Sequence, residues 1–116
     1  MNGHARTGLA IAAALAASSL LACDTLMPKR SPGESLYRQR CAQCHGVDGA
    51  GNMPRVIGNP YADLTDGVWR QGGDRYTIQN VIHEGVFGQM PGNPDLEPEE
   101  RRQLADHVLS LRRESG

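Results

Sequence analysis

Residues 41–45 read Cys-Ala-Gln-Cys-His, and this motif is the most informative feature of the sequence. A spacing of three residues places both thiols on one side of a helical turn, and an imidazole follows directly. This is the attachment pattern of haem c, in which two thiols form thioethers with the haem vinyl groups and the adjacent histidine ligates the iron. The sequence therefore predicts one covalent haem c, attached through Cys41 and Cys44, with His45 as an iron ligand.

Two other kinds of site use the same residue types. A Cys-X-X-Cys pair can be a thiol–disulfide oxidoreductase site, but that pair usually opens a helix in an α/β unit, whereas Cys41 follows a predicted helix. A zinc site needs further ligands, and neither His83 nor His107 is paired with another ligand at the usual spacing. The haem interpretation is therefore favoured, and an absorption spectrum would separate it from the dithiol alternative.

Met90 is the predicted second axial ligand of the iron. It lies in the Gly- and Pro-rich stretch 88–92, where a methionine has no apolar neighbours to pack against. Met53 follows the haem-binding histidine too closely to reach the opposite haem face easily, and Met27 lies in the N-terminal tether. His83 would give a bis-histidine site, but it lies within a predicted helix beside an acidic residue. Methionine–histidine ligation closes the iron to small molecules and favours electron transfer over catalysis.

The composition supports a bound cofactor and argues against nucleic-acid binding. The chain has 116 residues, only 4% of them aromatic, and 14 glycines. Without the predicted leader roughly 90 residues remain, which is short for a self-sufficient core, and a large apolar cofactor would supply what is missing. The net charge is −1 and Lys29 is the single lysine. No basic stripe is present, so we expect no nucleic-acid partner.

The N-terminal segment resembles a bacterial lipoprotein leader. Arg6 precedes an apolar stretch over 9–21, which is shorter than the roughly 20 residues of a membrane span. Residues 20–23 read Leu-Leu-Ala-Cys and resemble a lipobox, which predicts a lipid on Cys23. Ordinary cleavage near residue 22 and an uncleaved helical anchor are the alternatives. Asp24 resembles the signal that retains lipoproteins in the inner membrane.

These features divide the chain into three parts. We predict a lipoprotein signal peptide over 1–22, a lipidated N-terminus and tether over 23–32, and a cytochrome c domain over 33–116.

The domain is predicted to be all-α, with short helices joined by long loops. Capping signals set the predicted helices: from a Ser31 cap with Pro32 and Glu34 to Cys41, from an Asp74 cap to Gly85, and from Pro98 to the region of Arg112 and Arg113. Residues 46–60 and 86–95 are rich in Gly, Asn and Pro and read as loops. Loops of this length are expected where the chain wraps a cofactor.

Together, residues 41–46, the Met90-Pro91 pair and residues 104–111 resemble class I cytochrome c domains, over essentially all of 33–113. Within that class, residues 63–69, Gly72-Gly73 and residues 88–91 look like one haem domain of the dihaem subunit of cbb-type terminal oxidases. That subunit carries two haem sites and a membrane helix, whereas this chain has one haem-binding motif. The resemblance implies the cytochrome c fold, with helices and Gly/Pro loops around one haem.

The resemblance also implies roles around the haem. A loop proline carbonyl accepts a hydrogen bond from the proximal histidine, and Pro60 or Pro54 is the candidate. Trp69 is expected against the haem edge near a propionate, where its indole N–H would find a partner. Arg70 and Arg75 are weaker candidates for pairing with a propionate.

The class also crosses its first and last helices at a small residue and aromatic side chains. Gly33 and Tyr37 fit this pattern on the first helix. On the last helix, His107 stands where an aromatic residue is often found.

The expected function is that of a membrane-tethered monohaem electron carrier, not an enzyme, on the periplasmic side of the inner membrane. Its redox partners would be an oxidase, a reductase or a dehydrogenase. The alternatives are a haem enzyme or gas sensor with a dissociable methionine, or the cytochrome subunit of a larger oxidoreductase complex.

Overall fold

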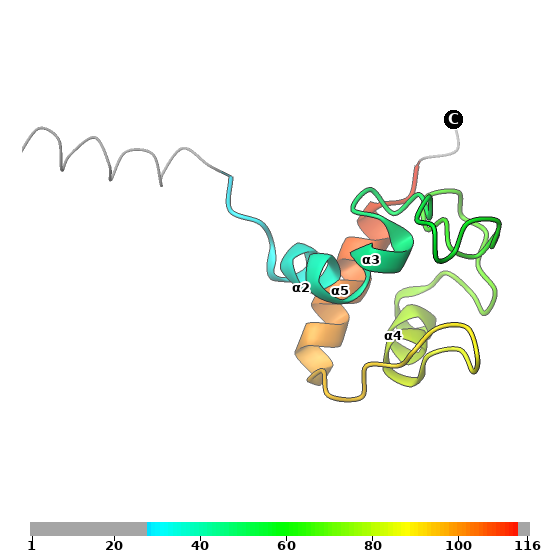
Figure 1. Cartoon of the computed structure of the whole chain (residues 1–116). Helices are drawn as coiled ribbons and strands as arrows, with labels where there is room; N and C mark the ends of the chain where they lie inside the picture. Colours follow the sequence, from blue (N-terminus) through cyan, green and yellow to red (C-terminus); the bar gives the residue numbers. More distant parts are fainter. Residues whose placement is uncertain (1–27, 114–116) are drawn as a thin grey trace, which may run out of the picture.

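The structure is a computed structural model that describes residues 28–113 (Figure 1). The predicted leader over 1–22, Met27 and the predicted lipid attachment site at Cys23 lie outside the described residues. Within 28–113, no helix is long and apolar enough to cross a membrane.

The described chain is helical, as predicted. Its helices are α2 (Pro32–Arg40), α3 (Ala42–His45), α4 (Arg75–Glu84) and α5 (Pro98–Ser110). Between residues 28 and 113 the β-type pairing is limited to one antiparallel bridge, between Val86 and Met90. The two predicted loops are present, and α5 ends a little before the predicted Arg113.

Side-chain caps set the starts of α2 and α4. The Ser31 hydroxyl accepts a hydrogen bond from the Glu34 N–H at 3.1 Å, and the Asp74 carboxylate accepts one from the Thr77 N–H at 3.0 Å. Both predicted N-caps are thus confirmed. The Glu34 carboxylate does not complete a capping box but accepts a hydrogen bond from Arg38 at 2.9 Å.

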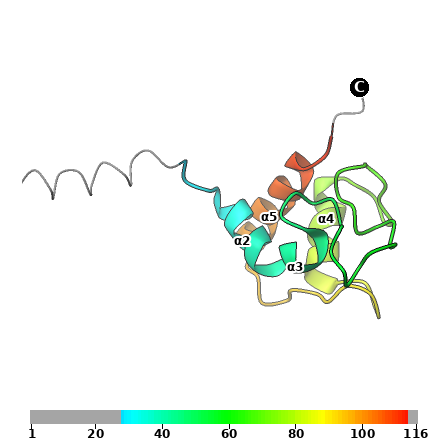
Figure 2. The same ribbon diagram turned by 45° about the horizontal axis from the view of Figure 1, so that its top comes forward.

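Helices α2 and α5 cross at the predicted small residue (Figures 1 and 2). A Cβ atom on Gly33 would overlap the backbone carbonyl of Gln103, so only glycine allows this approach. Beside the crossing, the rings of Tyr37 and His107 lie 5.0 Å apart with an interplanar angle of 56°. His107 therefore takes the aromatic position at the crossing.

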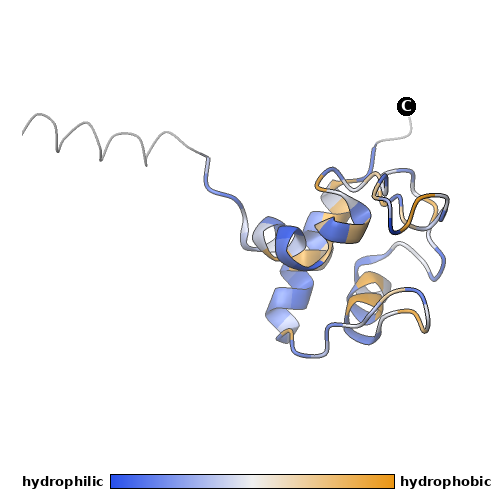
Figure 3. Ribbon diagram, in the orientation of Figure 1, coloured by the Kyte–Doolittle hydropathy of each residue, from blue (hydrophilic) through white to orange (hydrophobic). Residues whose placement is uncertain are grey.

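Helix α5 also packs against α4, and the buried apolar side chains of both helices form much of the core, together with Tyr37 of α2. In Figure 3 parts of α4 and of the C-terminal half of α5 are coloured hydrophobic, as are parts of α3 and of the loops. The core includes Ile78 and Ile82 of α4 and Leu104 and Val108 of α5. Loops cover the sides of α3 and α4 that the other described helices leave open. A cavity lies between α3, α4 and these loops.

Candidate functional site

A cavity of about 440 Å³ lies between α3, α4 and the loops. This volume is within the roughly 300–1,000 Å³ range of cofactor and small-molecule sites. Much of its wall is apolar, with Leu64, Ile78, Val81 and Ile82 among the lining residues. None of the described residues that line it is Asp or Glu, so the cavity suits an apolar group with acidic substituents.

The two predicted attachment cysteines line this cavity together. Cys41 ends α2 and caps α3, and Cys44 lies one turn further along α3. Both are free thiols. Burial raises the pKa of the Cys41 thiol to about 11. A thiol–disulfide oxidoreductase needs a cysteine with a lowered pKa, so the environment of Cys41 does not favour that alternative.

His45, the last residue of α3, also lines the cavity, and a backbone carbonyl orients its ring. The imidazole Nδ1 lies 2.8 Å from the carbonyl oxygen of Ala62. A carbonyl only accepts hydrogen bonds, so Nδ1 carries the proton and Nε2 keeps a free lone pair. This is the tautomer that a metal-ligating histidine needs.

The acceptor corrects the prediction that Pro60 or Pro54 supplies this carbonyl. A turn closed by the hydrogen bond from the Ala62 N–H to the Asn59 carbonyl, at 3.1 Å, places Pro60 on its exposed outer part. Ala62 ends the turn on the inside and is 3% exposed. The carbonyl that meets His45 is therefore two residues later than the sequence suggested.

Met90 reaches the same cavity from the loop after α4. Its backbone forms hydrogen bonds of 2.8 Å in both directions with Val86, which close a tight loop. Gly85, with φ +74°, ends α4 so closely against the Met90 carbonyl that a Cβ has no room. The described structure thus brings Cys41, Cys44, His45 and Met90 to one cavity.

The rival axial ligands lie elsewhere. Met53 and His83 are not among the residues that line the cavity. The Nδ1 atom of His83 lies 3.0 Å from the guanidinium of Arg101, and His107 packs on Tyr37.

Trp69 lines the cavity, and its indole N–H is buried without a hydrogen-bond partner among the described residues. A buried donor in this state is normally satisfied by an ordered water or by a bound group. Of the two weaker candidates, Arg70 lines the cavity and stacks over Tyr61, whereas Arg75 is paired with Asp106 at 2.6 Å.

The sequence did not point to Arg112, whose guanidinium lies over the Trp69 ring, 4.7 Å from its centroid. This contact forms because the end of α5 lies beside the 69–73 loop, which is distant in sequence. No local spacing of residues signals that contact.

These residues fit a covalent haem. The cavity brings together two thiols, an oriented imidazole and a thioether, and an unpartnered indole N–H suits a propionate. Soft thioether and imidazole ligands are those that hold haem iron in cytochromes c.

Comparisons with known proteins agree with this chemistry. Residues 28–108 match the family described as "Cytochrome C oxidase, cbb3-type, subunit III". The chain is 39% identical over 80 residues to the cbb3-type cytochrome c oxidase subunit CcoP of Cereibacter sphaeroides, covering 68% of this chain and 26% of that protein. It is 38% identical over 85 residues to the FixP subunit of Azorhizobium caulinodans, covering 72% and 28%. The chain thus spans about a quarter of the length of these relatives.

A solved structure supports the fold directly. The KustC0563 c-type cytochrome aligns with a TM-score of 0.60 and 30% sequence identity, covering 70% of this chain and 98% of that one. The predicted cytochrome c fold and the likeness to a cbb-type oxidase haem domain are confirmed, and a covalent haem c with its iron follows from the family. The chain is a class I c-type cytochrome and belongs to the family of subunit III of cbb3-type cytochrome c oxidases.

Proposed function

We propose that this cytochrome transfers single electrons, with haem c attached through Cys41 and Cys44 and its iron held between His45 and Met90. The observation that carries the proposal is that these four side chains, from α3 and from the loop after α4, line one cavity. When bound, the haem supplies an iron that cycles between the ferric and ferrous states.

The protein residues keep this site suited to electron transfer. The Ala62 carbonyl holds the His45 ring in the tautomer that leaves Nε2 free. The tight 86–90 loop holds the Met90 thioether at the cavity, where a soft ligand favours the reduced state. The apolar wall excludes water, so few dipoles need to rearrange when the charge changes.

A haem enzyme or gas sensor with a dissociable methionine is the second candidate. Such a site needs an open iron face and a distal acid–base residue. Among the described residues that line the cavity, His45 is the only histidine and no carboxylate is present. This lining supports the electron carrier over the catalyst.

Spectroscopy of the exported protein tests the proposal. The haem should stay with the polypeptide through acid–acetone extraction and give a pyridine haemochrome spectrum of the two-thioether type. The proposal fails if the colour extracts into the solvent. Wild-type protein should also bind carbon monoxide only slowly, because the methionine closes the iron, whereas rapid binding would favour the sensor or enzyme.

The cellular setting completes the proposal. Cleavage before Cys23, at the Leu-Leu-Ala-Cys sequence, and lipidation of that cysteine would anchor the domain to the periplasmic side of the inner membrane. The intact mass of the mature protein should show a diacylglyceryl group on an N-terminal Cys23. A soluble product that begins elsewhere would refute the anchor.

The partners are proposed to be redox proteins, with an oxidase first. The names of the relatives, subunits of cbb3-type oxidases, support an oxidase over a reductase or dehydrogenase. The chain would then be either a free carrier or the cytochrome subunit of that larger complex. Purification from native membranes under mild detergent should recover an oxidase with the cytochrome, and recovery of a dehydrogenase or reductase instead would redirect the assignment.

A further inference from the structure

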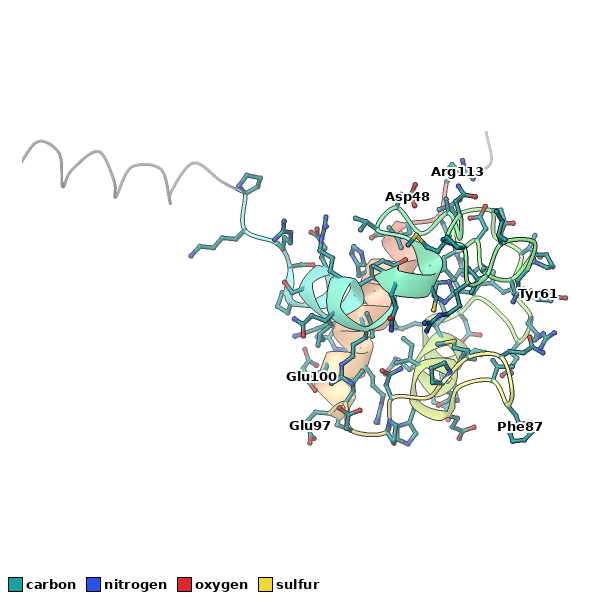
Figure 4. All side chains as sticks on the ribbon, viewed as in Figure 1. Asp48, Tyr61, Phe87, Glu97, Glu100 and Arg113 are labelled. Atoms are coloured by element: carbon teal, nitrogen blue, oxygen red, sulfur yellow. The ribbon has the colours of Figure 1, made fainter. Side chains whose placement is uncertain are left out.

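The segment over 85–97 carries Met90 from α4 to α5 and folds back onto the end of α4. In Figure 4 the labelled Phe87 marks its outer part. The side-chain amide of Asn93 donates a hydrogen bond of 3.2 Å to the Ile82 carbonyl, and the Asn93 backbone N–H donates one of 2.8 Å to the same oxygen. The last turn of α4 therefore holds the middle of the segment.

One guanidinium joins the two ends of this segment. Arg101, near the start of α5, has its Nη1 atom 3.0 Å from the Nδ1 atom of His83 and donates a hydrogen bond of 3.0 Å to the Leu96 carbonyl. A guanidinium only donates, so the His83 Nδ1 accepts, and Nη1 has two hydrogens for the two acceptors. His83 lies in the last turn of α4, and Leu96 lies two residues before α5 begins at Pro98. Arg101 therefore bridges the points where the segment leaves α4 and enters α5.

The Arg101 bridge is better protected from solvent than the ion pair formed by the same segment. Arg101 and His83 are both half-buried, and Leu96 is 3% exposed. Asp95 pairs with Arg40 at 2.7 Å, but these side chains are 60% and 36% exposed. Exposed ion pairs contribute little because solvent weakens them. The Arg101 bridge is therefore the contact more suited to hold the segment in place.

We propose that Arg101 is a positioning residue for the axial methionine, and that its bridge between α4 and the end of the 85–97 segment limits how often Met90 leaves the iron. This inference rests on the proposed ligation of the iron by Met90. A loop opens locally at a free energy set by the contacts that must break. The two hydrogen bonds of Arg101 are among those contacts, because they join the two ends of the segment.

Imidazole binding to the ferric holoprotein measures this opening. At saturating imidazole, the observed rate reaches the rate at which Met90 leaves the iron. We expect Arg101→Gln to raise this limiting rate about five- to tenfold, the effect of losing hydrogen bonds of ordinary strength. Arg101→Lys should give an intermediate rate, because one ammonium on a shorter side chain cannot reproduce both contacts.

Arg102→Gln is the matched control. It removes the same charge at the next residue, whose side chain is 48% exposed and pairs with Glu99 within α5. Its limiting rate should stay within about twofold of the wild-type rate, because an exposed pair contributes little.

His83→Leu tests the other end of the bridge. It removes one of the two acceptors and should also raise the limiting rate. Arg101→Gln should then have a smaller effect in the His83→Leu background than in the wild type, because the two residues act through one contact.

Equal limiting rates in Arg101→Gln and Arg102→Gln, with only the free energy of unfolding lowered in the former, would overturn the proposal. Arg101 would then be a purely structural contact between α4 and α5. Fully additive effects of Arg101→Gln and His83→Leu would overturn the bridge as well. Failure of the proposed function would look different, since the wild type would then lack the methionine–iron band or show an imidazole-binding rate that rises without a limit.

Discussion

The Nδ1 atom of His45 and the carbonyl oxygen of Ala62 lie 2.8 Å apart although 17 residues separate them in sequence. This hydrogen bond sets both the tautomer and the orientation of the imidazole. A hydrogen bond from the outer nitrogen also makes the ligating nitrogen a stronger donor to a metal. We therefore expect the position of the Ala62 carbonyl to affect the reduction potential of an iron that His45 ligates.

Gly51→Ala should disturb this relationship. Gly51 has φ +69°, and an added Cβ would come within 2.5 Å of the Ala62 backbone. The substitution should push the carbonyl away from His45, weaken the imidazole as a donor and raise the reduction potential. Voltammetry of the holoprotein measures this change.

Gly58→Ala is the matched control for this substitution. Gly58 has φ +85°, but a Cβ added there would have no neighbouring atom within 4 Å. It should show only the backbone cost of a left-handed alanine, about 1–2 kcal/mol of unfolding free energy. Equal potentials in the two variants would show that the Ala62 contact does not tune the iron.

Gly85→Ala tests how the methionine loop is held. Its Cβ would meet the Met90 carbonyl and, at 2.5 Å, the Gly92 nitrogen. The loop should shift, and the ferric methionine–iron charge-transfer band should weaken at neutral pH. Absorbance of the oxidised protein measures the band.

Gly88 in the same loop supplies the comparison. It also has positive φ, +72°, and nothing lies within 4 Å of an added Cβ. Gly88→Ala should leave the band largely intact. Loss of the band in both variants would mean that the loop is generally fragile and that the contact at Gly85 has no special role.

His107 predicts a pH dependence of stability. Burial lowers the pKa of His107 below its ordinary 6.5, with Glu34 acting to raise it and Arg38 to lower it. Because the folded state holds fewer protons than the unfolded state, the stabilising contribution is present above pH 6.5 and is lost as the pH falls through the folded pKa. Chemical unfolding of the holoprotein between about pH 5 and 8 should show stability rising with pH up to about 6.5 and levelling off above it.

His107→Phe should remove much of that slope while keeping a ring against Tyr37, whose centroid lies 5.0 Å away. An unchanged slope in this variant would assign the pH dependence to other groups.

The sequence predicted what local chemistry determines. Serine and aspartate are favoured N-cap residues, so the starts of α2 at Ser31 and of α4 at Asp74 could be predicted from the sequence. The haem-binding motif could be recognised because its two cysteines and its histidine lie within five contiguous residues. Met90 could be selected because its Gly- and Pro-rich neighbours leave it no packing role.

What the sequence did not reveal depends on contacts between distant segments. Pro60 was expected to supply the carbonyl for His45, but the turn from Asn59 brings Ala62 inward instead. Arg112 reaches Trp69 only because α5 ends beside the 69–73 loop. The protruding Phe87 and Tyr61 in Figure 4 likewise follow from loop paths and not from residue type, since an apolar side chain normally predicts burial.

We predict that His45 and Met90 hold the iron of a covalent haem c, and visible absorption spectra of the wild type and two methionine variants check this prediction. Ferric wild-type protein should show the thioether–iron charge-transfer band, and Met90→Ala should lose it, bind carbon monoxide and have a lower reduction potential. Met53→Leu should leave the band and the potential nearly unchanged, because Met53 does not line the cavity. Loss of the band in Met53→Leu together with its survival in Met90→Ala would show that Met53, and not Met90, ligates the iron.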